Sequence, residues 1–218
     1  FAPIVIGANV YGVFHHKPDT HGAGMAMCWD KMTLAVCPGY PRLIGTGIMS
    51  SPPHSGLFTP TLNRAVAFRA RQHVNDFLPL SRRDPIAFEG ARRVWAKAKE
   101  QAGITLDDLD LVETHDCFTM AEMIEYEAMG LAKPGEGWKV AREGITSRGG
   151  KLPVNLSGGL KSRGHPIGAT GVSQHVMAAM QLTGDAGEMQ LDGAKLAGVF
   201  NMGGAAVANY VSILERVK

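Results

Sequence analysis

The sequence predicts a layered α/β domain in which helices cover both faces of a five-stranded mixed sheet and one helix is buried at its centre. Three observations support this fold class. Helical and strand-like segments alternate through the second half of the chain, one predicted helix is apolar on all sides, and 218 residues are enough to bury a large core.

The first clear element is the apolar run at residues 42–49, which is typical of a buried strand. Proline, serine, glycine and histidine follow, so we expect residues 50–83 to form a long loop. Asp84 and Pro85 then provide a cap and a first-turn proline for a helix. Its apolar residues recur every three or four positions until Gly103 ends the pattern.

The elements after this helix alternate in type. We expect a strand at 109–114, a helix at 117–131, a glycine-rich loop at 131–152, a strand at 152–158, a helix at 168–184 and two strands within 195–215. The helix at 168–184 consists almost entirely of small and apolar residues, which predicts burial on every side. The last two strands flank a double glycine and should form a hairpin in the core.

Composition excludes several classes of function. A formal net charge of +2 gives no electrostatic reason to bind nucleic acid or an anionic membrane. No segment has the roughly 20 apolar residues of a membrane helix, and none has the pattern of a signal peptide, so a cytoplasmic location is expected. Three cysteines are too few for a disulfide framework, and the histidines His15, His16 and His21 fit a solvated loop better than a metal site.

The stretch GGLKSRGHPIGATG, residues 158–171, places one histidine among five glycines. Glycines let the backbone turn tightly and approach a ligand, and Pro166 restricts the backbone directly after His165. A phosphate-binding loop is disfavoured because the stretch lacks a lysine-serine ending. His165 is therefore a candidate functional residue, with a structural histidine in a turn as the alternative.

A second candidate stretch is THDCFT, residues 114–119, which lies between a predicted strand and a predicted helix. Open α/β sheets place their ligand clefts at such strand ends. A cysteine at the start of a helix can have its pKa lowered from ~8.5 towards neutrality, which makes Cys117 a candidate acid/base. The alternative is an inert, half-buried thiol.

Three ordered segments, THDCFTMAEM, NLSGGLKSRGHPIGATG and FNMGGAAVANY, resemble the C-terminal half of the thiolase superfamily. They are most similar to the sterol-carrier-protein type, whose members are acetyl-CoA acetyltransferase-like enzymes of lipid metabolism. The resemblance implies a thiolase fold, with residues 40–218 as its C-terminal domain, including the loops at 50–83 and 131–152. Residues 1–39 would be a remnant of the N-terminal half or a linker.

The resemblance also implies roles for four residues. His165 would activate a nucleophilic cysteine and help to bind the thioester oxygen, and His115 would complete that oxyanion site directly or through water. Cys117 would carry a proton to and from the α-carbon of the acyl group. Gly203 would offer its backbone N–H to a second oxyanion hole, in the stretch Asn201-Met202-Gly203 where other thiolases have a cysteine.

The expected nucleophile is missing from the recognisable motifs. Neither Cys28 nor Cys37 is followed by the small residues and glycine that the family has at this turn, and residues 1–39 are too short for the other half of the fold. Another segment or chain should therefore bring the thiol. The start at Phe1 fits a processed product, a fragment or an incompletely built chain.

The expected function is thus a thiolase-type acyltransferase, cleaving a 3-ketoacyl-CoA or running the reverse Claisen condensation. Coenzyme A would be a substrate, with no cofactor and no metal. The alternatives are a non-catalytic acyl-CoA-binding subunit and a thiolase-like retro-aldolase acting on a CoA thioester. Expected partners are acyl-CoA and CoA, a second copy or a chain with the nucleophile, and a zinc-ribbon/oligonucleotide-fold protein. Arg148 and Lys161 could face CoA phosphates or simply be solvated.

Overall fold

The computed structural model describes residues 34–36, 43–46 and 65–217, and the chain divides into two compact units. The smaller unit comprises residues 1–68 and 215–218. In it, β1 (Leu34–Val36) pairs antiparallel with β2 (Leu43–Thr46), and β2 pairs antiparallel with the first residues of β3 (Ala65–Asn75). β2 confirms the strand expected at 42–49 for the residues described there.

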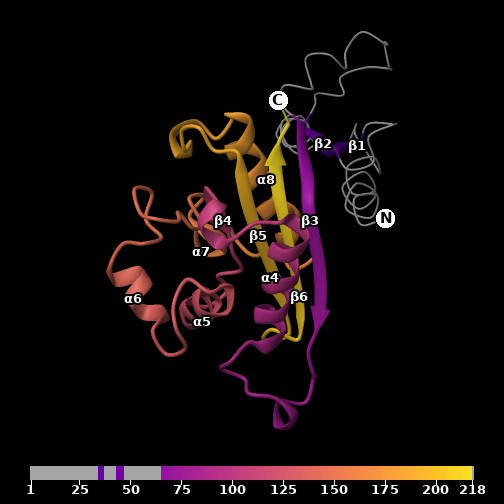
Figure 1. Ribbon diagram of the computed structural model, residues 1–218, viewed down its shortest axis with the longest axis vertical. Coiled ribbons are helices and arrows are strands. Elements are labelled where there is room, and N and C mark those ends of the chain that lie inside the picture. The colour runs from indigo at the N-terminus through magenta and orange to yellow at the C-terminus, as the bar shows by residue number, and fades with distance from the viewer. Residues whose placement is uncertain (1–33, 37–42, 47–64, 218) are drawn as a thin grey trace. The chain divides into compact units, whose positions relative to one another are not determined.

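The larger unit, residues 69–214, is built on four strands in the order β3-β6-β5-β4 (Figure 1). β4 (Leu111–Glu113) runs parallel to β5 (Leu196–Gly203), whereas β3 and β6 (Ala208–Arg216) point in opposite directions, so the sheet is mixed. β5 and β6 are sequence neighbours and sheet neighbours, which confirms the predicted hairpin.

Five α-helices surround these strands in the part of the chain that the structure describes. They are α4 (Glu89–Ala102), α5 (Thr119–Met129), α6 (Gly137–Arg142), α7 (Gly159–Arg163) and α8 (Thr170–Thr183), with 3-10 turns at Leu80–Arg82, Leu106–Asp108 and Gly187–Met189. The helices α4, α5 and α8 end at Gly103, Gly130 and Gly184, whose φ angles of 64°, 96° and 80° are left-handed. Such glycines supply the C-terminal cap that the sequence predicts.

The helices α4 and α8 cover opposite faces of the sheet. Trp95 of α4 contacts Gly198 and lies beside Phe200, whereas Gly171 of α8 approaches Asn201. Successive side chains of a strand point to opposite faces, so the even and odd residues of β5 contact different helices. No residue of α8 is exposed, which confirms the predicted buried central helix.

The strand β3 corrects the expectation of a loop over 50–83. Along it, buried side chains alternate with exposed ones: Val66, Phe68, Ala70 and Val74 against Arg69, Arg71 and His73. This is the period-two pattern of a strand with one buried face. The pattern is weak in the sequence because alanine and arginine are poor strand signals.

The fifth strand, expected at 152–158, is not confirmed. The segment makes only one isolated bridge, between Val112 and Val154. Pro153 has no N–H to donate, and Asn155 has a left-handed φ of 52°, which an extended strand cannot contain. Asn155 instead accepts the N–H of Thr114 through its side-chain oxygen at 2.8 Å.

One helix boundary and one expected loop also differ from expectation. The helix expected from Asp84 begins at Glu89, because the Asp84 carboxylate accepts the N–H of Ile86 at 2.9 Å in a turn and Phe88 has a left-handed φ of 43°. The expected loop at 131–152 contains α6.

Within the described residues, no helix is long and apolar enough to cross a membrane.

Candidate functional site

The candidate site forms where two loops meet the end of β5 at one end of the sheet. His115 and Cys117 follow β4 directly, and Asn201 lies near the end of β5. His165 comes from the loop between α7 and α8. Because β4 and β5 are parallel, their carboxyl ends lie at the same edge of the sheet, where open α/β sheets hold ligands.

The structure brings His115 and His165 into ring contact. Their ring centroids are 4.9 Å apart and the rings are nearly perpendicular, at 85°. His115 is buried with 5% of its surface exposed, whereas His165 is exposed. Two of the residues predicted from separate motifs therefore meet, one on the protein side of the site and one facing solvent.

The ring of His115 is held by Asn201. The Nδ1 atom of His115 lies 2.6 Å from Oδ1 of Asn201, and because an amide oxygen only accepts, Nδ1 carries the donated proton. Burial is the largest cause and lowers the pKa of His115. The hydrogen bond to Asn201 opposes it, the neighbouring His165 lowers the pKa further, and Asp116 has a smaller raising effect. His115 is therefore neutral near pH 7, with its lone pair at Nε2.

Asp116 links the loop of His115 to the helix that precedes His165. Its Oδ1 accepts the N–H of Leu160 at 2.7 Å, and its Oδ2 lies 3.8 Å from Nζ of Lys161. Gly159 has a φ of 66°, and a Cβ atom there would lie 2.1 Å from Oδ2 of Asp116. Only glycine allows the backbone of α7 to approach this carboxylate so closely.

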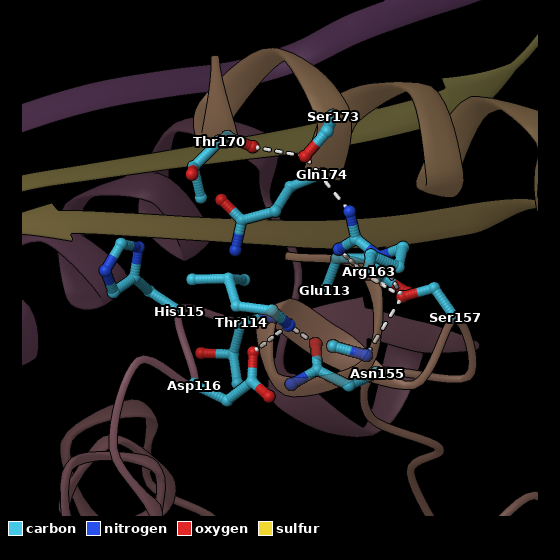
Figure 2. Close-up of polar contacts among 12 residues, drawn as sticks. Glu113, Thr114, His115, Asp116, Asn155, Ser157, Arg163, Thr170, Ser173 and Gln174 are labelled. Carbon is cyan, nitrogen blue, oxygen red and sulfur yellow. Dashed lines mark hydrogen bonds and ion pairs between the residues drawn. The ribbon is translucent and has the colours of Figure 1, made fainter. Parts of the chain in front are cut away.

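A second link runs through Glu113 and Arg163 (Figure 2). Nη2 of Arg163 lies 3.1 Å from Oε2 of the buried Glu113, and Ser157 donates to the same oxygen at 2.7 Å. Nη1 of Arg163 donates to Ser173 at 3.0 Å. Burial raises the pKa of Glu113, while Ser157 and Arg163 oppose that rise. The end of β4 is thus joined to both segments that flank His165.

Cys117 lies two residues after His115 and packs, partly buried, against the apolar core. Burial and the acidic side chain of Glu125 raise its pKa, which corrects the expectation of a lowered value. The helix α5 begins only at Thr119, two residues after Cys117, and burial outweighs the backbone N–H groups that favour the thiolate. Within the described residues, no hydrogen bond joins Cys117 to either imidazole.

Gly203 is exposed at the end of β5, and a Cβ atom there would meet nothing within 4 Å. The turn that follows is strained, because Ala205 and Ala206 have positive φ angles of 51° and 63°. Arg83 braces this turn by donating to the carbonyl of Ala205 at 2.8 Å. The open space above Gly203 leaves room for a ligand to approach its backbone.

Other candidates receive partners of their own. Arg148 donates to the carbonyls of Glu188 and Gln190 at 2.7 and 2.6 Å. Lys161 lies 2.8 Å from Oε2 of Glu122. Each of these two cationic side chains therefore has a partner within the protein itself.

The cysteines and histidines considered in the N-terminal stretch lie outside the residues that the structure describes. They are Cys28, Cys37, His15, His16 and His21. The part that is described contains no cluster of three or more His, Cys, Asp or Glu side chains suited to a metal ion.

Sequence reasoning did not assign roles to Asn201, Asp116 or Thr170. The Nδ1 atom of His165 lies 2.6 Å from Oγ1 of Thr170, so each histidine has a polar anchor. An asparagine within a strand was one available signal, because asparagine is depleted there unless its side chain is used.

Comparison with known proteins gives one family and several relatives. The family described as "Thiolase C-terminal domain-like" matches residues 73–216, more than half of the chain. An acetyl-CoA acetyltransferase of Methanothermobacter thermautotrophicus is 40% identical over 135 residues, covering 62% of this chain and 35% of that protein. Human sterol carrier protein 2 is 40% identical over 151 residues, covering 66% and 27%.

Among solved structures, the "Ltp2-ChsH2(DUF35) aldolase" aligns with a TM-score of 0.62 at 19% identity, covering 71% of this chain and 40% of that chain. At this identity the likeness is one of fold. The chain spans about a third or less of the length of the two curated relatives above.

Proposed function

Because the chain belongs to the thiolase C-terminal domain-like family, we propose that it supplies one half of an acyl-transfer site acting on coenzyme A thioesters. The reaction is thiolytic cleavage of a 3-ketoacyl-CoA or the reverse Claisen condensation. The observation that carries the proposal is the contact between His115 and His165, with ring centroids 4.9 Å apart. Two imidazoles from separate loops can together accept a proton and stabilise an oxyanion.

His165 acts first, as the base. Its exposed ring accepts the Sγ–H proton of a nucleophilic cysteine, and the thiolate then attacks the 3-keto carbonyl. The resulting imidazolium stabilises the oxyanion of the tetrahedral intermediate. The nucleophile comes from a segment outside the described residues or from another chain.

His115 assists through water. Its neutral ring donates from Nδ1 to Asn201, so Nε2 has a lone pair and cannot donate to an oxyanion. A water molecule that donates one hydrogen to Nε2 and the other to the oxyanion bridges the two. Of the two roles expected for His115, this geometry favours the water-mediated one.

When the tetrahedral intermediate collapses, the C2–C3 bond of the substrate breaks and the acyl group stays on the nucleophilic cysteine. Cys117 serves as the acid that protonates the enolate of the departing acyl-CoA. Its raised pKa keeps the thiol protonated at neutral pH, which suits a proton donor in the cleavage direction. In the condensation direction the same thiol must first lose its proton, and the raised pKa makes this less favourable than for an ordinary cysteine. Gly203 provides the second oxyanion donor through its backbone N–H.

Intact-mass measurement of the full-length protein after incubation with an acyl-CoA tests this proposal. The expected result is a covalent adduct of one acyl group on a cysteine, removed again by free CoA. If no chain in the preparation gains an acyl group, the acyl-transfer mechanism is wrong.

A non-catalytic acyl-CoA-binding subunit is the second candidate, and the absence of the family's nucleophile pattern around Cys28 and Cys37 favours it. It predicts binding of acyl-CoA without any adduct. A retro-aldolase is the third, compatible with the fold of the aldolase above. It would release a ketone or aldehyde rather than a second acyl-CoA, and product analysis distinguishes the two reactions.

The proposal extends to partners. Acyl-CoA and CoA are substrates, and no cofactor or metal is required. A second copy, a chain with the nucleophile, or a zinc-ribbon/oligonucleotide-fold protein would complete the assembly in the cytoplasm. Size measurement of the natural complex, with identification of its chains, tests these expectations.

A further inference from the structure

We propose that Thr170 is a positioning residue that fixes His165 as the Nδ1–H tautomer, so that Nε2 is the proton acceptor whenever the ring is neutral. The assignment of the tautomer rests on the hydrogen bonds that Thr170 makes with His165 and Pro166. Its consequence for acyl transfer rests on the proposed function.

The hydroxyl of Thr170 lies between two groups that determine where its proton goes. Oγ1 is 3.1 Å from the carbonyl oxygen of Pro166 and 2.6 Å from Nδ1 of His165. The same carbonyl accepts the backbone N–H groups of Ala169 and Thr170 at 2.8 and 3.0 Å. A carbonyl oxygen only accepts, so in the proposed arrangement the hydroxyl donates its single proton to Pro166. The lone pair of Oγ1 then faces Nδ1, and in this arrangement that nitrogen is the donor. A neutral imidazole that donates from one nitrogen accepts at the other.

Thr170 is itself held in place. It is 1% exposed, and its carbonyl accepts the hydroxyl of Ser173 at 2.9 Å. Ser173 accepts from Arg163, which pairs with Glu113 at the end of β4 (Figure 2). The acceptor for His165 is thus connected to the strand that leads into His115. A buried acceptor with fixed partners is suited to imposing one tautomer.

The two imidazoles of the site share this arrangement. Asn201 accepts from Nδ1 of His115, as Thr170 does from Nδ1 of His165. Neither Nε2 atom has a hydrogen-bond partner among the described residues. The reactive nitrogen of each ring is therefore left for substrate, water or the incoming thiol.

Nuclear magnetic resonance of the full-length protein with 15N-labelled histidine tests the assignment, at a pH where His165 is neutral. We expect a protonated-type shift for Nδ1 of His165 and an unprotonated-type shift for Nε2. Thr170→Ser keeps the hydroxyl and should keep this pattern. Thr170→Val keeps the shape and should move the ring towards the Nε2–H tautomer. His165→Gln identifies the signals by their loss.

His175 serves as the internal control. Its Nδ1 lies 2.6 Å from the carbonyl of Gly171 in the same helix, so it must stay the Nδ1–H form in every folded variant. An Nε2–H tautomer of His165 in the unaltered protein would overturn the proposal even if Thr170→Val does not fold. So would an unchanged His165 pattern in a folded Thr170→Val protein.

Acylation separates this inference from the proposed function. In a protein that forms an acyl adduct, Thr170→Val should slow acylation about 10- to 100-fold and Thr170→Ser should restore it. Acylation of Thr170→Val at the unaltered rate would refute the positioning role. If the expected tautomer is seen but no acyl adduct forms, the proposed function fails while the assignment of the tautomer stands.

Discussion

His115 and His165 lie in ring contact, yet their surroundings differ in a way that separates their chemistry. His115 is buried, and burial lowers its pKa, whereas His165 reaches solvent. The buried ring is therefore a fixed, neutral acceptor, and the exposed ring is the one that an incoming thiol can reach. Asn201 determines the tautomer of the buried ring, because its side-chain oxygen accepts from Nδ1.

Asn201→Asp should change the charge of His115. A carboxylate facing Nδ1 favours the imidazolium, so the pKa of His115 should rise by about 1 unit or more. Titration of the labelled ring by nuclear magnetic resonance measures this directly, with His165 as the comparison in the same spectra. A pKa of His115 that stays at or below that of the unaltered protein would contradict the assigned contact.

The buried carboxyl of Glu125 should make the stability of the protein depend on pH. It is fully buried, burial raises its pKa well above the usual range, and Thr114 donates to it at 2.5 Å. A folded-state pKa above the unfolded value stabilises the fold below the unfolded pKa of about 4.3, and this stabilisation is lost as pH rises towards the folded value.

Glu125→Gln replaces the protonated acid by a neutral amide of the same shape and removes this titration. Its free energy of unfolding, measured with urea, should increase relative to that of the unaltered protein as pH rises from about 5 to 8, by up to about 1.4 kcal/mol per pH unit. A difference that does not change with pH would show that Glu125 is ionised in the folded protein.

At the scale of elements, a short strand and a short helix position the site. β4 has three residues, yet Glu113 at its end and Asp116 just beyond it hold α7 and the loop of His165. The close approach of α7 depends on Gly159. Small elements are marginal alone, so these polar contacts decide where they lie.

Gly159→Ala tests that approach. The new methyl group would displace the Asp116 carboxylate and would also strain a backbone with φ of 66°. Gly103→Ala is the matched control, because its φ is 64° and a Cβ atom there meets nothing within 4 Å. The control should cost about 1–2 kcal/mol of unfolding free energy, and Gly159→Ala should cost more. Equal losses would mean that α7 does not depend on this contact.

The elements also show what sequence could predict. Glycine caps and the apolar pattern of α8 made helix ends and a buried helix predictable, because these signals are local. β3 was missed because its buried face includes alanine and its exposed face is basic. The predicted strand at 152–158 failed at Asn155, whose left-handed backbone depends on a contact with Thr114 that is distant in sequence.

The candidate site divides in the same way. The family resemblance implied that His115 and His165 share one site, and the structure places their rings in contact. The direction of the Cys117 pKa could not be predicted, because it depends on burial and on Glu125, eight positions further along the chain. Asn201 and Thr170 become visible as anchors only when the strands and loops are assembled.

At the scale of the whole molecule, the described residues hold only part of the proposed catalytic site. The family match covers residues 73–216, and the curated relatives are about three times longer or more than the matched part. In the proposed acyl-transfer reaction, the acid/base and oxyanion groups are those of His165, His115, Cys117 and Gly203. The proposed reaction takes its nucleophile from outside the described residues.

The most direct test compares two reactions of the full-length protein with its natural partners: acylation by acyl-CoA, which is a half-reaction, and CoA-dependent cleavage of a 3-ketoacyl-CoA, which is the complete reaction. The unaltered protein should perform both, His165→Ala should lose both, and Cys117→Ala should still be acylated while its cleavage rate falls by about 100-fold or more. Cleavage by Cys117→Ala at the unaltered rate, or acylation that does not depend on His165, would contradict the account.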